Sequence, residues 1–200
     1  IGIDRVESYE FVRDFVGSVS EAGCSVFIVH ARNAWLQGIS PKENRELPPL
    51  KPDWVLRLKA DFPGLQFSIN GGIKTMAHIR MHLSELDGVM VGREAYHNPW
   101  LLSEWDEALG ALPTALTRDD VETQMVTYMQ KQALNGVPWF AVARHMLGLR
   151  HAQHGARKWR QVWSDHRLKQ LPVAEVALLA QQALAQDKSA VQTELLSQPD

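Results

Sequence analysis

Two short apolar runs that end in glycine constrain the fold of this chain more than any other feature. The first spans Ser68 to Ile73 and the second spans Gly88 to Arg93, and a helix-like pattern follows each. A buried parallel strand that turns into a helix has this pattern. Glycine at the end of such a strand lets backbone N–H groups approach an anion closely, and the next helix directs its positive end there.

Paired loops of this kind, after the last two strands of a (β/α)8 barrel, form a phosphate site. The first loop contains Asn70, Gly71 and Gly72, and the second contains Gly92 and Arg93. Taken singly, the first loop fits an ordinary turn equally well. Two loops one helix apart, with an arginine ending the second, favour phosphate binding.

The overall composition excludes several classes of protein. With a net charge of −2, the chain of 200 residues has no global affinity for nucleic acid or membranes, so any basic patch must be local. No apolar run approaches the length of a membrane span. The single cysteine, Cys24, excludes an internal disulfide and fits a reducing compartment, so we expect a cytoplasmic protein.

The first half of the chain alternates between strand and helix patterns, and it begins at Ile1 in what resembles the end of a strand. Helical spacing is predicted over 9–22, 53–61, 75–83 and 98–109, a short turn over 94–96, and strands over 24–30, 65–69 and 88–91. We expect Ser8 and Thr75 to cap their helices. This order of strands and helices predicts the second half of a (β/α)8 TIM barrel, from the end of its fifth strand to its eighth helix. We therefore interpret the sequence as a C-terminal fragment of a longer protein.

After a linker from Gly110 to Thr117, the pattern changes to helices alone. These are predicted over 118–134, 138–149, 155–165 and 173–185, and Thr117 to Asp120 is a strong N-terminal cap for the first of them. The sequence after Gln186 is polar without periodicity, which predicts a disordered tail over 187–200. The fold class is thus α/β followed by all-α, with domains at 1–110 and 117–186.

His30 ends a predicted strand, at the position where barrel strands carry reactive and ligand-binding residues. A histidine there can donate to a carbonyl or phosphoryl oxygen, whereas a buried histidine satisfied by the backbone is the alternative. Arg32 and Arg93 could each fork onto a phosphate or carboxylate, or form surface ion pairs.

The loop from Ala31 to Leu50 is too long for a routine connection, which indicates a function. Within it, Lys42 and Arg45 lie three residues apart and face one side if the segment forms a turn. Glu43 and Glu46 have the same spacing, so an exposed, ion-paired turn is an equal alternative.

The segment from Arg144 to Lys169 contains seven basic residues and one acid, Asp165. Such segregation in an acidic chain favours nucleic-acid binding, with a solvated helix face as the alternative. Arg157 and Arg160 lie three apart on a helix and would face a nucleic-acid backbone together. The segment also contains Trp159 and Trp163, which we interpret as core residues.

The sequence gives little support for a metal site, a hydrolase triad or a catalytic cysteine. We see no cysteine or histidine cluster with zinc spacing and predict no metal site. No serine, histidine and aspartate set of a hydrolase is evident. Cys24 begins a buried strand, where a catalytic thiolate would be poorly placed.

The two glycine loops, together with Ile28 to Arg32, resemble the tRNA-dihydrouridine synthases. The loop from Ala34 to Arg45 narrows the resemblance to the bacterial A subfamily, and the segments at 144–149 and 155–160 agree with it. The similarity covers about residues 1–166 and is specific to this family.

The resemblance implies an FMN-binding TIM barrel, whose second half is 1–110, followed by a helical tRNA-binding domain. It implies reduction of D-loop uridines, at positions 20 and 20a, to 5,6-dihydrouridine, with FMN recharged by NADPH. The complete protein would be a monomer. By resemblance, FMN is bound by His30, Asn70, Gly71, Gly72, Gly92 and Arg93, and tRNA is contacted by Lys42, Arg45, Arg157 and Arg160.

The resemblance also identifies what this chain lacks. The family's proton donor is a cysteine on a loop in the first half of the barrel, upstream of Ile1, and Cys24 does not match that motif. The chain therefore contains no catalytic residue, and we expect it to be inactive alone. A phosphate-binding metabolic barrel and a catalytically dead tRNA-binding remnant are the alternatives. The basic segment argues against the metabolic barrel, and sequencing upstream of Ile1 distinguishes the remnant.

Overall fold

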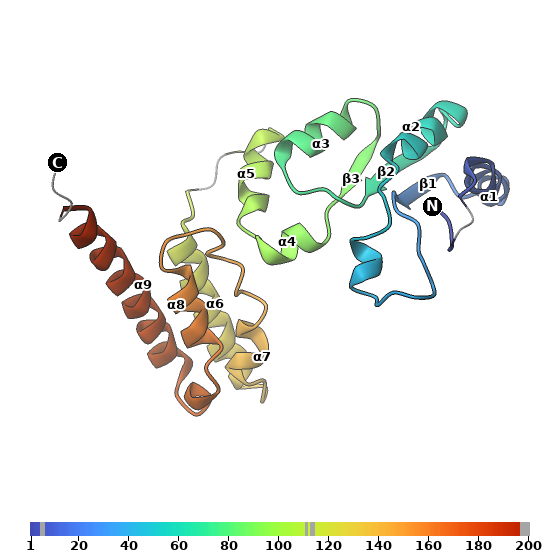
Figure 1. The fold of residues 1–200 in the computed structure, drawn as a ribbon. Coiled ribbons are helices and arrows are strands. Elements are labelled where there is room, and N and C mark those ends of the chain that lie inside the picture. Colours follow the sequence, from blue (N-terminus) through green and yellow to red (C-terminus); the bar gives the residue numbers. More distant parts are fainter. Residues whose placement is uncertain (5–6, 111, 113–114, 197–200) are drawn as a thin grey trace. The chain divides into compact units, whose positions relative to one another are not determined.

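The computed structural model describes residues 1–4, 7–110, 112 and 115–196, and it has a mixed α/β structure that is mostly helical. It divides into two compact units, Ile1–Glu94 and Ala95–Asp200 (Figure 1). The first unit contains the sheet, and the second consists of helices. Each unit has its own core.

Three parallel strands form the sheet of the first unit, in the order β1 (Val26–His30), β2 (Gln66–Asn70) and β3 (Gly88–Met90). His30 pairs with Asn70, and Asn70 pairs with Met90, so the carboxyl ends of all three strands lie at one edge. The strands predicted over 24–30, 65–69 and 88–91 are confirmed. The predicted strand end at Ile1 is only an isolated bridge, from Ile3 to Ala34.

The two faces of the sheet differ in burial. Phe67 and Ile69 of β2 are almost completely buried, and Phe27 stacks on Phe67 with ring centroids 5.5 Å apart. On the other face, Val26 and Ile28 of β1 are 56% and 60% exposed. The prediction that β1 is a buried strand was therefore wrong, because its apolar side chains alternate between a packed face and an open one.

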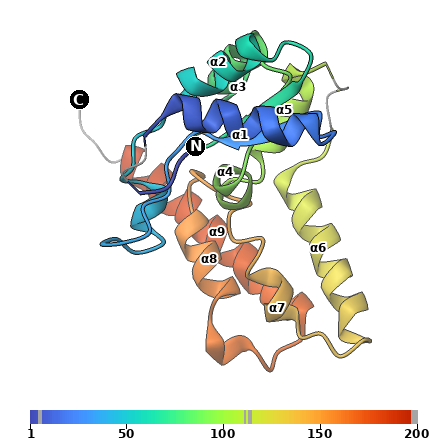
Figure 2. The same ribbon diagram turned by 90° about the vertical axis from the view of Figure 1, so that its right-hand side faces the viewer.

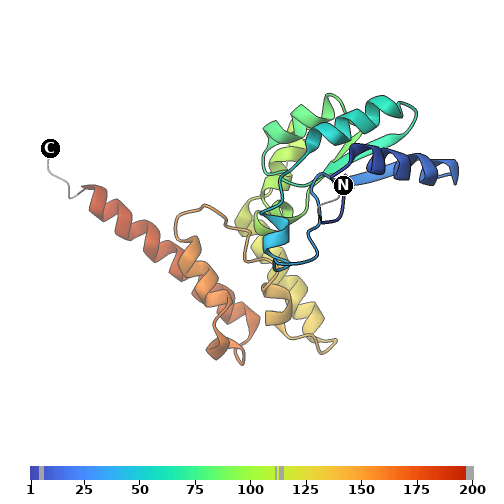
Figure 3. The same ribbon diagram turned by 45° about the vertical axis from the view of Figure 1, so that its right-hand side comes forward.

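Three helices flank the sheet: α1 (Tyr9–Glu21), α2 (Pro52–Asp61) and α3 (Met76–Leu83). The predicted caps are confirmed, since Ser8 and Thr75 each accept a hydrogen bond at the start of their helices. The hydroxyl of Tyr9 donates to Asp61 at 2.6 Å, so α1 and α2 lie side by side (Figure 3). The short helix α4 (Arg93–His97) follows β3 where a turn was predicted.

The second unit contains α5 (Leu101–Ala108), α6 (Arg118–Ala133), α7 (Trp139–Ala143), α8 (Ala156–Trp163) and α9 (Val173–Leu196), with α8 and α9 side by side (Figure 2). A capping box of Thr117 and Asp120 starts α6, as the sequence predicted. Residues 111, 113 and 114 of the predicted linker lie outside the described residues.

Two helix ends differ from the predictions. The helix predicted to reach Leu149 ends as α7 at Ala143, because the following backbone forms tighter i to i−3 bonds, such as Leu149 N–H to Met146 O. The last helix, predicted to end at Ala185, continues to Leu196, so the predicted tail is partly helical. Residues 197–200 of that tail lie outside the described residues.

The core of the second unit is built around a buried carboxylate. Glu122 of α6 is 2% exposed, and its two oxygens accept four hydrogen bonds. The donors are the indole N–H groups of Trp159 (2.8 Å) and Trp163 (3.1 Å), Arg150 (2.6 Å) and Gln181 (2.7 Å). The interpretation of both tryptophans as core residues is confirmed.

Candidate functional site

The candidate site lies at the carboxyl edge of the sheet, where β1 and β2 end beside each other. His30 and Asn70 are register partners, so the first glycine loop follows directly from the strand next to His30. A Cβ atom at Gly71 would lie 3.4 Å from Cε1 of the His30 ring and 3.1 Å from Cδ2 of Leu50. The structure thus brings together the histidine and the loop that the sequence nominated separately.

Glycine is required at two positions of this loop by backbone conformation. Gly71 has φ of +111° and Gly72 has φ of +74°, in the region that side chains disfavour. A Cβ atom at Gly72 would also lie 2.5 Å from Cδ1 of Leu50. Leu50, at the end of the long loop, therefore lies directly over both glycines.

The backbone of both glycine loops offers hydrogen-bond donors. Among the described residues, none accepts a bond from the N–H groups of Gly71, Gly72 or Gly92. A Cβ atom at Gly92 would meet nothing within 4 Å. An unpaired N–H group next to open space, as at Gly92, can bind an anion.

Arg93 ends the second loop and contacts the long loop after β1. Its Nη2 donates to the carbonyl oxygen of Arg45 at 3.1 Å, and its Nη1 lies 3.4 Å from the carboxylate of Glu46. The Arg93 side chain is 52% exposed, so the ion pair is accessible to solvent.

Arg32 is used differently from either sequence alternative. Its Nη1 donates to two backbone carbonyl oxygens of the long loop, those of Glu46 (2.8 Å) and Pro48. Among the described residues, no carboxylate forms an ion pair with Arg32. Arg32 therefore fixes the loop, and sequence spacing contains no signal for such a backbone contact.

The local environment favours the neutral form of His30. Burial lowers the pKa of this imidazole, and the nearby positive charges of Arg32 and Arg93 lower the pKa further. A neutral imidazole can still donate one hydrogen bond, which fits the predicted role toward a ligand oxygen.

Lys42 and Arg45 are both exposed, at the short 3₁₀ turn η1 (Glu43–Arg45). The turn forms, but the alternative in which its acids pair with Lys42 and Arg45 is not seen among the described residues. Glu43 instead accepts a bond from Ser40 N–H at 2.8 Å, and Glu46 pairs with Arg93. Both cations are left to solvent on this loop.

The segment Arg144 to Lys169 is not one uniform basic face. Arg150 is 3% exposed and binds Asp119 and Glu122. Burial lowers the pKa of the Arg150 guanidinium, but hydrogen bonds to these two acids raise this pKa by more, so it is raised overall. Arg167 pairs with Asp165 at 2.7 Å.

Arg157 and Arg160 remain available on α8. Arg157 is exposed and lies on the side of α8 opposite to Trp159, whereas Arg160 is half-buried and lies three residues before Trp163. Among the described residues, neither guanidinium has an ion-pair or hydrogen-bond partner. These two residues keep the arrangement that the sequence predicted for contact with a phosphate backbone.

The sequence analysis overlooked one histidine pair, His78 and His82, which lie four apart on α3. Burial lowers the pKa of His82, which is 7% exposed. Over the described part of the chain, no group of three or more possible ligand side chains is placed to hold a metal ion. Cys24 precedes β1, so it lies at the end of the strand opposite to His30.

A sequence model of the dihydrouridine synthase family (Dus) matches residues 1–187. The chain therefore belongs to the dihydrouridine synthase family. Three bacterial relatives, each named tRNA-dihydrouridine(20/20a) synthase, are similar to it. The protein from Pasteurella multocida is 52% identical over 183 residues, which are 89% of this chain and 56% of the relative.

The relative from Shewanella oneidensis is 46% identical over 199 residues, covering 99% of this chain and 57% of the relative. The one from Escherichia coli K12 is 49% identical over 168 residues, covering 83% and 49%. The chain thus spans about half the length of the relatives that it matches. Within the described part of the chain, no helix has the length and apolar character needed to cross a membrane.

Proposed function

We propose that the protein reduces uridines 20 and 20a of tRNA to 5,6-dihydrouridine, with bound FMN and with NADPH as reductant. The observation that carries this proposal is the family match over residues 1–187, together with relatives named for that reaction. The sheet edge described above supports it independently, because it offers an anion site beside a neutral histidine.

The residues present fit the phosphate of FMN. Gly71 and Gly72 have the conformation of a close backbone approach, and the open space at Gly92 leaves room for a ligand. Unpaired N–H groups and the Arg93 guanidinium supply donors and positive charge. We propose that His30, Asn70, Gly71, Gly72, Gly92 and Arg93 hold the cofactor. When bound, FMN supplies the hydride for the base.

The protein residues bind, orient and exclude water. The pKa of His30 is lowered by partial desolvation and by neighbouring cations, so its imidazole can donate a hydrogen bond to a ligand oxygen without adding full charge. Arg93 would hold the phosphate of the cofactor in place of Glu46, its present partner. Leu50 covers the glycine loop and keeps water from it.

We propose that the sheet is part of a TIM barrel, with residues 1–110 as its second half. Parallel strands in sequential order, with helices between them, support this arrangement. The exposed side chains of Val26, Ile28 and Met90 support it also, since they occupy the face that a barrel turns inward.

Reduction of the base also needs a proton at C5. Cys24 is unsuitable, because it lies before β1 and His30 lies at the other end of that strand. We propose that a cysteine outside this chain donates the proton, as in the family. The chain alone is then inactive, and the intact protein acts as a cytoplasmic monomer.

We propose that tRNA is bound by Lys42 and Arg45 from the long loop and by Arg157 and Arg160 from the helical domain at 117–186. The exposure of Lys42, Arg45 and Arg157, and the lack of ion-pair partners for these side chains among the described residues, support this role. The target uridine must leave the tRNA fold to reach the cofactor.

The test is a stepwise reaction with the intact protein under anaerobic conditions. NADPH should bleach the absorbance of bound flavin, and unmodified tRNA should restore it. Fully modified tRNA, whose target positions are already reduced, is the control and should restore nothing. Flavin that is bleached but never restored by unmodified tRNA would contradict the proposal.

A further inference from the structure

A cavity of about 390 Å³ opens between α6 and the segment that begins with α7. Val121, Met125 and Tyr128 form one wall, at helical spacing along α6. The opposite side includes Val142 and His145. The full lining is Pro99, Val121, Met125, Tyr128, Ala141, Val142, His145, Met146 and Leu149. No charged acid or base is among these residues.

A chain of three hydrogen-bonded side chains extends from the edge of this cavity. Nε of Arg144 donates to Nε2 of His145 at 3.0 Å, and Nδ1 of His145 lies 2.9 Å from the hydroxyl oxygen of Tyr96. His145 lines the cavity, whereas the other two residues flank it. All three are exposed.

The direction of the hydrogen bonds among these three side chains follows from which atoms can only donate. An arginine N–H can only donate, so Nε2 of His145 must be the acceptor and the ring proton must be on Nδ1. That proton is donated to the Tyr96 oxygen. The Tyr96 hydroxyl proton is then left over, and no acceptor for it exists among the described residues. The terminal nitrogens of Arg144 likewise have no acceptor in the described part of the chain.

The edge of the cavity therefore presents donors and positive charge, and its interior presents an apolar surface with two flat rings, Tyr128 and His145. Flat apolar walls suit an unstacked nucleobase, which RNA-binding proteins stack on aromatic, histidine or arginine side chains. Donors without acceptors suit phosphate oxygens. The volume lies within the range of small-ligand pockets.

We propose that this cavity binds one unstacked nucleotide of the RNA substrate, with the base against Tyr128 and His145 and the phosphate at Arg144 and Tyr96. The inference rests on the proposed function, because it takes RNA as the substrate. An apolar side chain of a protein partner is the competing occupant. Such a side chain would fill the interior but would leave the donors of Arg144 and Tyr96 without a role.

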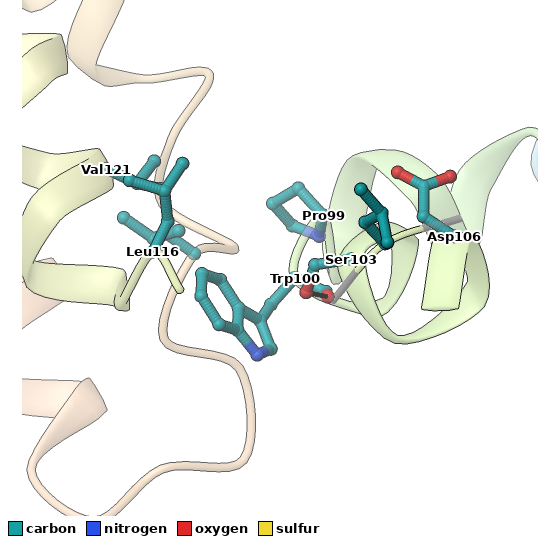
Figure 4. A pocket seen from close by; sticks show the side chains of 8 residues that line it. Pro99, Trp100, Ser103, Asp106, Leu116 and Val121 are labelled. Carbon is teal, nitrogen blue, oxygen red and sulfur yellow. Dashed lines mark hydrogen bonds between the residues drawn. The ribbon is translucent and has the colours of Figure 1, made fainter. Parts of the chain in front are cut away.

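A second cavity of about 350 Å³ adjoins the first, since Pro99, Val121 and Leu149 line both (Figure 4). It does not enter the proposal. Its lining includes Leu112 and Leu116, which flank residues that the structure does not describe. Its aromatic residue, Trp100, already has the guanidinium of Arg118 at 4.4 Å from its ring centre.

The first experiment measures binding of an unmodified tRNA transcript to the intact protein. Tyr128→Ala should weaken binding at least about 5-fold, because stacking on one base is lost. Tyr96→Phe should weaken it about 2- to 10-fold, because one hydrogen bond is lost. Tyr128→Phe keeps the ring and should bind like wild type. Gln130→Ala, an exposed change on α6 outside the cavity lining, is the matched control.

The second experiment uses only wild-type protein, so misfolding of a variant cannot affect its result. A transcript that contains photo-crosslinkable thiouridine is irradiated with wild-type protein, and the linked peptides are identified by mass spectrometry. Crosslinks to peptides with Tyr128 or His145 support the site. Crosslinks found only outside residues 96–99 and 121–149, or wild-type affinity in both Tyr128→Ala and Tyr96→Phe, overturn it and favour the protein partner.

The experiments distinguish a failure of the proposed function from a failure of the nucleotide site alone. If wild-type protein neither binds tRNA nor forms dihydrouridine, the proposed function is wrong and this inference fails with it. If wild-type protein does both and the cavity variants bind normally, only the nucleotide site is wrong.

Discussion

The guanidinium of Arg93 lies 3.4 Å from the carboxylate of Glu46, so the cation at the end of the second glycine loop is paired with an acid of the long loop. A phosphate that binds to Arg93 must compete with this acid. The same long loop contains Lys42 and Arg45, and the carbonyl oxygen of Arg45 accepts a second bond from Arg93. Cofactor binding and the position of the proposed RNA-contacting loop are thereby linked through one side chain.

Removal of Arg93 should weaken FMN binding in the intact protein. Arg93→Ala deletes a charge-assisted contact worth about 1.5–3 kcal/mol, so the dissociation constant should rise at least about tenfold. Glu46→Gln deletes the competitor and should leave FMN bound as tightly or more tightly. Fluorescence titration of flavin-free protein measures both.

Arg80→Ala is the matched control, since Arg80 is an exposed arginine of α3 outside the proposed site. If Arg93→Ala retained FMN as well as Arg80→Ala does, Arg93 would not be a phosphate ligand.

A methyl group at Gly71 should cost stability and disturb the cofactor site. Gly71 has φ of +111°, and the added Cβ would lie 3.1 Å from Leu50. Strain of this kind costs about 1–3 kcal/mol, so Gly71→Ala should lower the melting temperature and FMN affinity together. Gly64→Ala is the comparison, because its Cβ would meet nothing within 4 Å and its φ is not positive. Equal melting temperatures for the two variants would show that the loop is not strained by a side chain.

Loss of charge at Glu122 should destabilise the helical unit strongly. Glu122→Gln keeps the volume but turns an amide N–H₂ toward two of the four donors and leaves Arg150 without one of its two negative partners. Breaking a buried pair costs about 3–5 kcal/mol, which urea unfolding would detect. Gln124→Ala, an exposed change on the same helix, should stay within about 0.5 kcal/mol. A Glu122→Gln protein as stable as Gln124→Ala would contradict the buried-carboxylate account of this core.

The two free arginines of α8 should determine part of the salt dependence of tRNA binding. Each lost phosphate contact lowers the slope of log affinity against log salt by about one, so Arg157→Ala with Arg160→Ala should lower it by about two. Reduction of bound flavin by NADPH should be unaffected, because neither residue lies in the unit that contains the glycine loops. Lys131→Ala, on exposed α6 surface, is the control. An unchanged slope of log affinity against log salt in the double variant would show that these arginines of α8 are solvated and do not contact tRNA.

The helix caps and the strand positions were predictable, because each depends on residues that are close together in the sequence. Ser8, Thr75 and Thr117 cap their helices as expected, and β2 and β3 lie where apolar runs end in glycine. The alternation of elements also placed His30 next to the loop at Gly71, since parallel strands end at one edge.

Contacts between distant side chains were not predictable in this way. Arg150 was counted as part of a basic face, but it is buried because Glu122 and Asp119, on a helix far earlier in the chain, supply its partners. For Arg32, the sequence suggested an anion or a surface ion pair as its partner, whereas its guanidinium donates to carbonyl oxygens of a loop whose path no periodicity reveals. The burial of β1 was also misjudged, because an apolar run does not say how many of its faces are packed.

The most direct test of the proposed function is mass spectrometry of tRNA treated with the intact protein. Unmodified tRNA, FMN and NADPH are incubated with the protein, and the nucleotides at positions 20 and 20a, the positions in the names of the relatives, are analysed. The account predicts a gain of two hydrogen atoms at uridines in these positions, dependent on NADPH and weakened in Arg93→Ala. Uridines that remain unreduced there in the presence of FMN-loaded, NADPH-reducible protein would contradict it.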